Sequence, residues 1–461
     1  MIVGVASVRI NFLSNLVGSI TTAAILLAVL PIYLHYLGAD AFGLIGVYTM
    51  LIGVAGLLDM GLTPALSREL ALQSASMEGR IQIRCTVRTL EICYASAAII
   101  IFGFAFILVP TLAQGWLKPT NLSATTVQQC LQIMSLQLAF QLPLSFYTGG
   151  FVGMQRQGLM NMLNTAMTAV RAGSTVLLLY TFNPDVVIFF VWQVIVTAAH
   201  LLLMALCLWK ILPTGVAVFK LEILKRLWRY AAGMIGITAL SILLTQLDKI
   251  ILSRTLSLEH FGYYMLAWNI ASVLLRPVGP VHNAWLPKMT QLAMADNVRE
   301  LAKLYHKGAQ LVNLLVVPIA ILTAVFSHQV LYLYTGSSKL ADATATALVL
   351  LTIGSACNAL MNIPYALTLA YGWTKFAIYQ NILASIVVLP LTYWTSTQYG
   401  LNGGGVGWMV VNVLYIALSL NFIHRRYLKT ELKQWYVGNF TLYFRENYSY
   451  IKTLFKHVPT R

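Results

Sequence analysis

Apolar runs of about 20 residues, separated by short polar segments, recur along the whole chain. Each run is long enough to cross the roughly 30 Å hydrocarbon core of a bilayer as a helix. Charged residues and turn-forming residues mark the breaks between runs. The pattern predicts twelve membrane spans, at about residues 10–36, 42–66, 90–112, 128–152, 158–181, 186–209, 230–253, 260–286, 309–335, 343–371, 376–397 and 403–423.

The composition also favours a membrane fold. Hydrophobic residues make up 59% of the 461 residues and charged residues only 10%, whereas soluble proteins carry about 25% charged residues. The predicted fold class is therefore an all-α polytopic membrane protein. We expect the first span to be retained, because its weakly charged N-terminal flank and lack of a small-residue cleavage motif differ from a signal peptide.

The basic residues predict the orientation of the chain. If the N-terminus is cytoplasmic, nearly all lysines and arginines between spans face the cytoplasm, and only Lys118, Arg254 and Lys339 face the other side. Membrane insertion favours this distribution, so both termini are predicted to be cytoplasmic. The net charge of +16 then requires no nucleic-acid partner. The basic tail, residues 425–461, suits contact with anionic membrane lipids.

The two halves of the chain resemble each other. The segment "FGLIGVYTMLIGVAGLLDMGLTPALSREL" begins at Phe42, and "FGYYMLAWNIASVLLRPVGPVHNAWLPKM" begins 219 residues later at Phe261. "GMQRQGLMNMLN" from Gly153 aligns with "AYGWTKFAIYQN" from Ala370 at a similar offset. Six spans per half is an even number, so we expect two parallel halves related by a pseudo-twofold axis along the membrane normal. The predicted division is residues 1–210, a connector at 211–229, residues 230–424 and the tail.

The sequence lacks the common motifs of catalytic and ATP-driven proteins. No phosphate-binding G-x-x-x-x-G-K-[ST] loop or zinc-binding H-E-x-x-H motif occurs, and the five cysteines form no C-x-x-C pair. We therefore expect no enzyme activity, no cofactor and no metal site. Two parallel halves that enclose a cavity favour a transporter that works by alternating access.

Several segments carry a family resemblance. The N-terminal run through "LPIYLHYLGADAFGLIGVYTM", the stretch "QLDKIILSRTLSLEHFGYYMLAWNIASVL" and the segment "YGLNGGGVGWMVVN" resemble Wzx-type polysaccharide flippases. These belong to the multidrug/oligosaccharidyl-lipid/polysaccharide exporter superfamily. The resemblance implies a bacterial inner-membrane protein that carries an undecaprenyl-pyrophosphate-linked O-antigen or capsule repeat unit from the cytoplasmic to the periplasmic leaflet. It also implies a cationic cavity, and it leaves open whether a polysaccharide polymerase is a partner.

Two arginines near mid-depth are candidates for contact with an anionic cargo. Arg276 lies within span 8 and Arg171 within span 5, where a charge costs about 2.5–3.5 kcal/mol. Their guanidinium groups match phosphate oxygens, so the pair could hold a lipid pyrophosphate. The alternative is structural pairing with buried acids, Arg276 with Asp59 or Arg171 with Asp248.

A second cluster of charges lies in the "TQLDKIIL" segment of span 7. Asp248 and Lys249 are adjacent and point about 100° apart on a helix, so we expect them not to face one another. Lys249 is a further candidate for the cationic cavity, although snorkelling to water is the favoured alternative. Asp248, with Asp59, is a candidate for coupling to H⁺ or Na⁺ or for a hydrogen bond between helices.

Prolines interrupt span 8 beside Arg276. Pro277 and Pro280 remove two backbone donors, which predicts a broken helix that lines the cavity or acts as a hinge; an ordinary kink is the alternative. His282 follows, either as a titrating group or as a plain polar packing residue. Aromatic residues could stack on sugar rings or belong to interfacial belts. They are Tyr263, Tyr264, Trp268, Tyr365, Tyr371 and Trp373.

Two other functions remain as alternatives to a flippase. An ion-coupled multidrug exporter would share the architecture but would rely on acidic and aromatic groups for cationic drugs. A membrane-embedded polymerase or glycosyltransferase would need catalytic acids or bases in a large outer loop. The longest such loop, residues 113–127, carries only Lys118, which disfavours this class.

Overall fold

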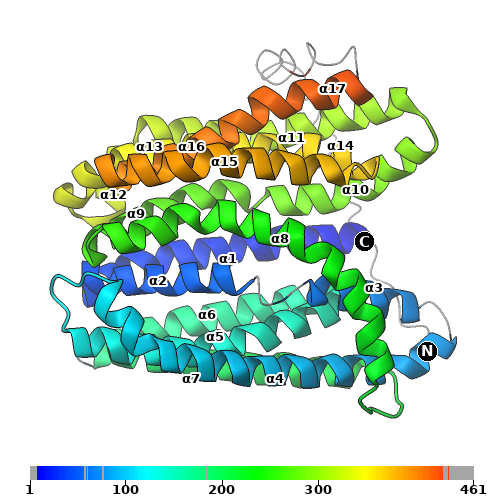
Figure 1. Ribbon diagram of the computed structural model, residues 1–461, viewed down its shortest axis with the longest axis horizontal. Helices are drawn as coiled ribbons and strands as arrows, with labels where there is room; N and C mark the ends of the chain where they lie inside the picture. The colour runs from blue at the N-terminus through cyan, green and yellow to red at the C-terminus, as the bar shows by residue number, and fades with distance from the viewer. Residues whose placement is uncertain are drawn as a thin grey trace, which may run out of the picture.

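The computed structural model describes residues 8–56, 59, 61–74, 77–182, 185–428 and 435. Within these residues the chain is helical apart from short turns, and no strand is present. Figure 1 shows the long helices lying side by side along one direction. The tail predicted at residues 425–461 lies mostly outside the described residues.

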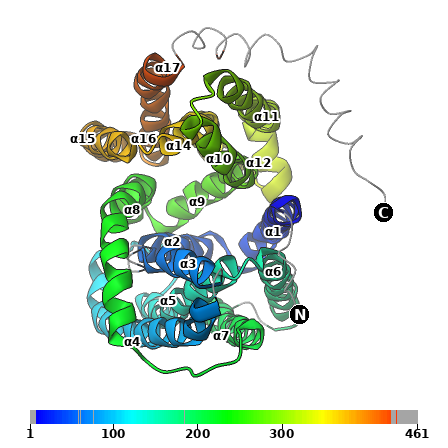
Figure 2. The same cartoon turned by 90° about the vertical axis from the view of Figure 1, so that its right-hand side faces the viewer.

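The first half of the chain contains seven of the described helices. They are α1 (Val8–Leu37), α2 (Ala39–Ala55), α3 (Leu62–Ser74), α4 (Met77–Gly115), α5 (Ala124–Gly153), α6 (Gln157–Thr181) and α7 (Val186–Ile211). Since α2 and α3 follow one another along one predicted span, the seven helices correspond to six spans. Seen along the helices in Figure 2, they form the lower of two groups.

The second half is more interrupted but follows the same plan. Its helices are α8 (Leu221–Thr255), α9 (Leu258–Ser272), α10 (Val278–Met294), α11 (Val298–Val325), α12 (Ser327–Thr335), α13 (Ser338–Leu360), α14 (Asn362–Ala370), α15 (Thr374–Tyr399), α16 (Leu401–Leu414) and α17 (Asn421–Tyr427). A short 3-10 turn, Val273–Leu275, follows α9, and a π-helical segment, Tyr415–Leu420, joins α16 to α17. These elements correspond to the other six predicted spans.

The breaks within spans 2 and 8 occupy equivalent places in the two halves. The first separates α2 from α3 and includes residue 59, and the second separates α9 from α10 at residues 273–277. Pro64 lies just after the first break, in the first turn of α3, and Pro277 lies within the second break. Proline lacks a backbone donor and disfavours helix in the residue before it, so both interruptions have a local cause.

The halves contact each other closely where α2 crosses α9, toward the left end in Figure 1. Gly43 and Gly262 lie at this crossing, and a Cβ on Gly43 would come within 2.1 Å of the Leu258 carbonyl oxygen. A Cβ on Gly262 would come within 2.9 Å of the Gly43 nitrogen. Only glycine permits so close an approach of two backbones. The repeated Phe-Gly pairs of the sequence therefore meet at the junction of the two halves.

Three apolar cores stabilise this arrangement. One lies within the first half around Phe146 and Phe151, and another lies within the second half around Met289 and Tyr305. The third includes residues from both halves, among them Phe42 and its repeat equivalent Phe261. The two halves are thus separate bundles that share a core near the α2–α9 crossing.

Helix α8 connects the halves. It begins at Leu221, inside the predicted connector 211–229, and its first turns pack on α3 and α4. Arg226 of α8 forms a 2.6 Å ion pair with Glu69 of α3. Figures 1 and 2 show α8 bending from the first half into the second.

Six of the predicted spans contain a described stretch that is long and apolar enough by itself to cross a membrane. Six helical stretches of the described residues meet both criteria: Ser14–Leu37, Glu78–Leu108, Val186–Ile211, Val298–Val325, Ser338–Ala370 and Leu401–Tyr427. Of the other spans, two are interrupted (α2–α3 and α9–α10), and four correspond to α5, α6, α8 and α15. Most of these helices contribute polar side chains to the two pockets described below.

Candidate functional site: a cationic cavity between the halves

A cavity of about 580 Å³ lies between the first half and the broken span of the second half. Helices α1, α3, α5, α6 and α7 contribute its lining, and Arg276 contributes from the break between α9 and α10. The lining residues are Asn15, Gly18, Ser19, Thr22, Thr63, Gln141, Leu144, Ser145, Thr148, Asn161, Asn164, Thr165, Met167, Thr168, Arg171, His200 and Arg276. None of these described lining residues carries a carboxylate, so the fixed charge of the cavity is positive.

Arg171 projects into this cavity from the middle of α6. Its Nη2 donates a 3.0 Å hydrogen bond to Oγ1 of Thr197 on α7, and Thr197 in turn donates to the Gln193 carbonyl oxygen at 2.7 Å. This contact fixes the guanidinium against α7. An arginine has five N–H donors, so most of them remain available to a ligand.

Arg276 reaches the same cavity because the helix is broken at this position. It follows the 3-10 turn, its backbone N–H bonds to the Val273 carbonyl oxygen at 3.1 Å, and its own carbonyl accepts a 3.3 Å bond from Ser19 on α1. Its side chain is exposed, and it forms no ion pair or hydrogen bond with another described residue. The guanidinium therefore faces the cavity with its charge uncompensated by the described part of the protein.

Neutral polar groups surround the two arginines. Asn161 on α6 donates a 2.5 Å bond to Asn15 on α1, and Asn15 donates a 2.7 Å bond to Gln157. Deeper in the first half, His200 lies 3.1 Å from Asn164 Oδ1. These contacts hold α1 and α7 on α6 and leave a wall rich in amides and hydroxyls.

Asp59 does not pair with Arg276, contrary to one prediction from the sequence. Its carboxylate instead accepts hydrogen bonds from the hydroxyls of Thr63, at 2.5 Å, and Tyr94, at 2.6 Å. The backbone N–H of Thr63 also donates to Asp59 at 3.3 Å, so the acid caps the start of α3. Thr63, four residues after Asp59, lies close enough to bond to the carboxylate, whereas Arg276 belongs to the opposite half. Asp59 still adjoins the cavity through Thr63, which lines it.

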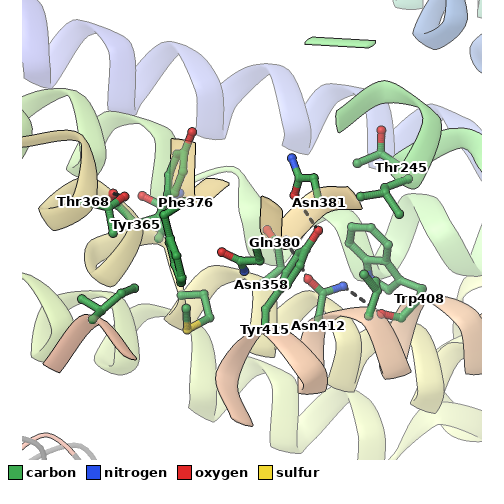
Figure 3. A pocket seen from close by; sticks show the side chains of 15 residues that line it. Thr245, Asn358, Tyr365, Thr368, Phe376, Gln380, Asn381, Trp408, Asn412 and Tyr415 are labelled. Atoms are coloured by element: carbon green, nitrogen blue, oxygen red, sulfur yellow. Dashed lines mark hydrogen bonds between the residues drawn. The ribbon is translucent and has the colours of Figure 1, made fainter. Parts of the chain in front are cut away.

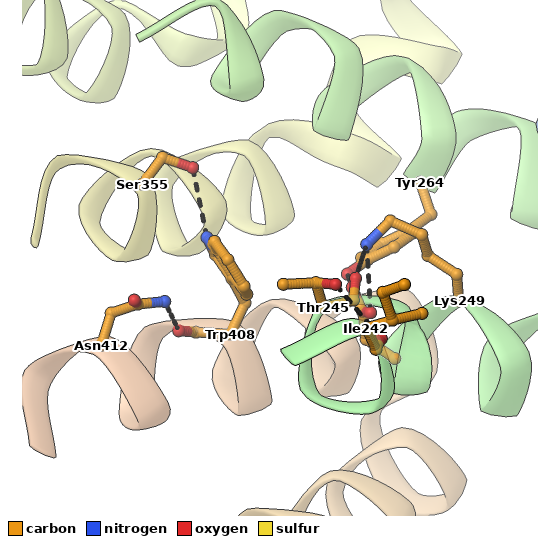
Figure 4. A network of polar contacts seen from close by, with 8 residues as sticks. Ile242, Thr245, Lys249, Tyr264, Ser355, Trp408 and Asn412 are labelled. Atoms are coloured by element: carbon orange, nitrogen blue, oxygen red, sulfur yellow. Dashed lines mark hydrogen bonds and ion pairs between the residues drawn. The ribbon is translucent and has the colours of Figure 1, made fainter. Parts of the chain in front are cut away.

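Asp248 and Lys249 contact one another, contrary to the expectation from their helical spacing. The Lys249 ammonium lies 3.1 Å from both carboxylate oxygens of Asp248 and donates a 2.8 Å bond to the Thr245 carbonyl. Figure 4 shows this network, in which the Tyr264 hydroxyl also donates to Asp248. Directions at Cβ differ by about 100°, but the four-carbon lysine side chain folds back along its own helix and closes the gap.

Two further predictions for this pair were wrong. Lys249 does not snorkel to water, since its exposed fraction is 1%, and it is absent from the lining of the cationic cavity. Asp248 is paired with Lys249 rather than with Arg171. The ammonium also lies 3.5 Å from the centroid of the Trp268 ring, a cation–π contact that compensates for burial.

The helix is broken at Pro277, whereas Pro280 and His282 lie within α10, and none of the three is among the lining residues of the cationic cavity. Pro277 directly precedes α10, and Pro280 lies within its first turn, where a missing backbone donor costs little. His282 Nδ1 lies 3.0 Å from Oδ1 of Asn362 on α14. The histidine therefore packs toward the second half and away from the two arginines, and its lining role in the cationic cavity is not observed.

Sequence reasoning missed the amides of this site, although a local pattern marks them. Asn161, Asn164, Thr168 and Arg171 recur at intervals of three or four residues, which places them on one face of α6. A polar stripe on an otherwise apolar span indicates a surface that faces water or a ligand. The periodicity of polar residues, rather than charge alone, would have identified α6 as a wall of the cavity.

Comparison with known proteins matches this architecture. The family model described as "Polysaccharide biosynthesis protein" matches residues 8–293, more than half of the chain. The chain belongs to this family. A second family model, MatE, matches residues 234–394. A putative O-antigen transporter from Shigella flexneri is 20% identical over 419 residues, which cover 90% of this chain and 97% of that protein.

Solved structures confirm the fold. An inward-facing multidrug resistance MATE transporter of the MOP superfamily superposes with a TM-score of 0.71 at 15% identity, covering 94% of this chain and 97% of that one. The lipid II flippase MurJ in an inward closed conformation gives a TM-score of 0.66 at 12% identity, covering 97% and 99%. The predicted twelve-span architecture of two six-span halves is thus confirmed. This member of the polysaccharide biosynthesis family thus shares the polytopic membrane fold of these transporters.

Proposed function

We propose that the protein carries an undecaprenyl-pyrophosphate-linked oligosaccharide, an O-antigen or capsule repeat unit, from the cytoplasmic to the periplasmic leaflet of a bacterial inner membrane. Membership of a polysaccharide biosynthesis family and the similarity to an O-antigen transporter support this cargo class. The basic segments between spans support cytoplasmic termini. The polysaccharide polymerase that would use the product is a candidate partner on the periplasmic side.

The observation that carries this proposal is the position of Arg171 and Arg276. One belongs to each half of the chain, both line one cavity, and no described lining residue offsets their charge. A lipid pyrophosphate brings two or more negative charges and many acceptor oxygens, which guanidinium groups bind in bidentate fashion. A cationic drug would meet repulsion at the same place, which disfavours the multidrug-exporter alternative.

Transport would then follow from rocking of the two halves. The close α2–α9 crossing joins the halves at one end, whereas Asn15 and Asn161 line the cavity near the first turns of α1 and α6. Cargo bound by an arginine from each half would draw the halves together, and the crossing would serve as the pivot. Ligand binding shifts such an equilibrium only through differential contacts, which a two-sided site supplies.

We also propose that an ion gradient drives the cycle, with H⁺ or Na⁺ as the coupling ion. Asp59 and Asp248 are the candidate acids, and each accepts a hydrogen bond from a tyrosine hydroxyl, Tyr94 and Tyr264 respectively. The half-buried Asp59 accepts from neutral donors alone among the described residues, whereas the buried Asp248 also accepts from the Lys249 ammonium. A carboxylate held in this way can exchange a proton or bind a small cation as access changes. Transport by Asp59→Asn and Asp248→Asn variants under imposed pH and Na⁺ gradients tests the assignment.

The decisive experiment is translocation of a headgroup-labelled undecaprenyl-pyrophosphate oligosaccharide by purified protein in liposomes. We expect transport by the wild type and by Arg425→Ala, a control that removes an exposed arginine of α17. We expect at least a tenfold lower rate for Arg171→Ala and Arg276→Ala at equal insertion. Transport of a cationic dye in place of the glycolipid would favour the drug exporter. Undiminished glycolipid transport by both variants would refute the cationic site.

A further inference from the structure

A second pocket lies within the second half, apart from the two arginines. Its volume is about 210 Å³, and it is bounded by α8, α13, α14, α15, α16 and the π-helical segment. Its lining includes five amide side chains and four aromatic rings, and no described lining residue is charged. The amides are Asn358, Asn362, Gln380, Asn381 and Asn412.

The aromatic rings and the amides have distinct places in this pocket. Figure 3 shows Phe376 and Trp408 at opposite sides, with Asn358, Gln380 and Asn381 between them. Buried apolar rings alone would suit a lipid chain, and amides alone would suit a peptide or water. Flat rings beside convergent amides instead match a molecule with apolar C–H faces and a rim of hydroxyls.

The amides are held in place but keep free hydrogen-bonding capacity. Asn358 donates a 2.8 Å bond to Asn412, and the Tyr415 hydroxyl donates a 2.8 Å bond to Asn381 Oδ1. Each amide has two donors and a carbonyl oxygen, so these contacts leave several positions open. Gln380 forms no hydrogen bond with another described residue. His282 fixes Asn362 from behind through its 3.0 Å contact.

The wall behind Trp408 is also rigid. The Trp408 indole N–H donates a 3.2 Å bond to Ser355, and the ring packs edge-on against Trp268 with centroids 5.0 Å apart. Trp268 in turn carries the buried Lys249 ammonium on its face. A platform held on two sides loses little entropy when a ligand stacks on it.

From these features we infer that the pocket binds one uncharged pyranose unit of the cargo. The volume of about 210 Å³ is below the roughly 300–1,000 Å³ of pockets that hold drug-sized ligands, which favours one sugar ring over an oligosaccharide. Neighbouring hydroxyls of a sugar accept and donate in the pattern that a carboxamide offers. The absence of charge in the described lining selects against uronic acids and amines.

This inference rests on the proposed function but adds a division of labour. The arginine cavity would hold the anionic pyrophosphate end, and the neutral pocket of the second half would hold a sugar. Specificity for the repeat unit would then reside in the amides of α13–α15, because groups left unpaired by the wrong sugar carry the full cost of burial.

Binding of simple sugars, measured without transport, tests the pocket. Purified protein in nanodiscs is titrated with methyl glycosides of neutral hexoses, 6-deoxyhexoses, N-acetylhexosamines and glucuronic acid, and saturation transfer to each sugar is recorded. We expect at least one neutral glycoside to bind and the glucuronide not to bind. Gln380→Ala should weaken binding about three- to tenfold. Gln398→Ala, an exposed amide on the same helix, should leave binding unchanged.

Further variants separate loss of the site from loss of the fold. Gln380 forms no hydrogen bond or ion pair with another described residue, so its variant should unfold near the wild-type temperature. Phe376→Leu, which removes a flat face but keeps an apolar side chain, should also weaken binding. Failure of every neutral glycoside to bind, binding of the glucuronide alone, or equal binding by the wild type and Gln380→Ala would overturn the inference.

The outcomes distinguish this inference from the proposed function. If neutral glycosides bind and Gln380→Ala weakens their binding while no glycolipid is transported, the sugar site is supported and the flippase proposal fails. If glycolipid is transported and depends on Arg276 while no glycoside binds, the flippase proposal stands and the sugar site fails.

Discussion

The ammonium group of Lys249 lies 3.5 Å from the centroid of the Trp268 ring while it donates to both carboxylate oxygens of its neighbour Asp248. Both charged side chains are buried, with exposed fractions of 1% and 4% for the two residues. The lysine thus exchanges water for a carboxylate, a backbone carbonyl and an aromatic face. Since Trp268 also contacts Trp408, this pair supports one wall of the neutral pocket.

Removal of one member of the Asp248–Lys249 pair should destabilise the protein strongly. An unpaired buried charge costs about 3–5 kcal/mol, so Lys249→Met and Asp248→Asn should each lower the free energy of unfolding by an amount of this order. The double variant removes both charges and should lose less than the sum of the two. Denaturant unfolding in detergent measures all three. Additive losses would show that the two groups do not stabilise one another.

Substitution of Arg276 should leave the stability of the fold nearly unchanged but should impair transport. Its side chain forms no hydrogen bond or ion pair with another described residue, so Arg276→Ala should change the free energy of unfolding by no more than about 0.5 kcal/mol. Arg276→Lys keeps the charge but loses the planar fork of donors. We expect the lysine variant to need a roughly tenfold higher glycolipid concentration for half-maximal transport. Lysine and arginine supporting equal transport would mean that only the net charge matters.

The internal repeat is the part of the fold that the sequence predicted best. The Phe-Gly pairs at Phe42 and Phe261 indicated equivalent segments, and the structure brings Gly43 and Gly262 to one crossing. Hydrophobic length predicted the spans because a bilayer fixes how long a helix must be. The contact itself could not be predicted, since the choice of facing helices depends on packing across the whole chain.

The candidate site was predictable only in part. Intramembrane arginines are rare enough that Arg171 and Arg276 stood out by charge, and both line one cavity. The contact of Lys249 with Asp248 was not predicted, because helical spacing gives the directions of the Cβ atoms only. A long side chain can fold back along its own helix. The neutral pocket had no local pattern, since its amides come from separate helices. Only the three-dimensional arrangement brings them together.

The glycine crossing should resist even small additions. Gly43→Ala and Gly262→Ala place a methyl group against the backbone of the partner helix, at 2.1 Å and 2.8 Å from a carbonyl oxygen. Overpacking of this kind costs about 1–3 kcal/mol, and here it also pushes the two halves apart. We expect a lower unfolding temperature and slower transport for both variants. Gly103→Ala in α4, where no atom lies within 4 Å of the added methyl group, is the control and should behave as wild type.

Asp40 should contribute strongly to the stability of the end of the molecule where α2 crosses α9. One of its carboxylate oxygens accepts backbone hydrogen bonds from Thr120, Asn121 and Leu122, at 2.8, 2.5 and 3.2 Å. The Asp40 residue is 3% exposed, so Asp40→Ala leaves three donors without this partner and should cost on the order of 3 kcal/mol of unfolding free energy.

The acid at the start of α7 provides a matched comparison for Asp40. Asp185 accepts a single 2.8 Å backbone bond from Val187, so Asp185→Ala should cost only about 1 kcal/mol. Thermal unfolding of the two variants in the same detergent measures the difference. Because Asp40 lies in the first turn of α2 and holds the loop before α5, its loss should also loosen the α2–α9 crossing at Gly43 and slow transport of the labelled glycolipid. Equal destabilisation by the two substitutions would show that the three-donor contact adds nothing beyond an ordinary helix cap.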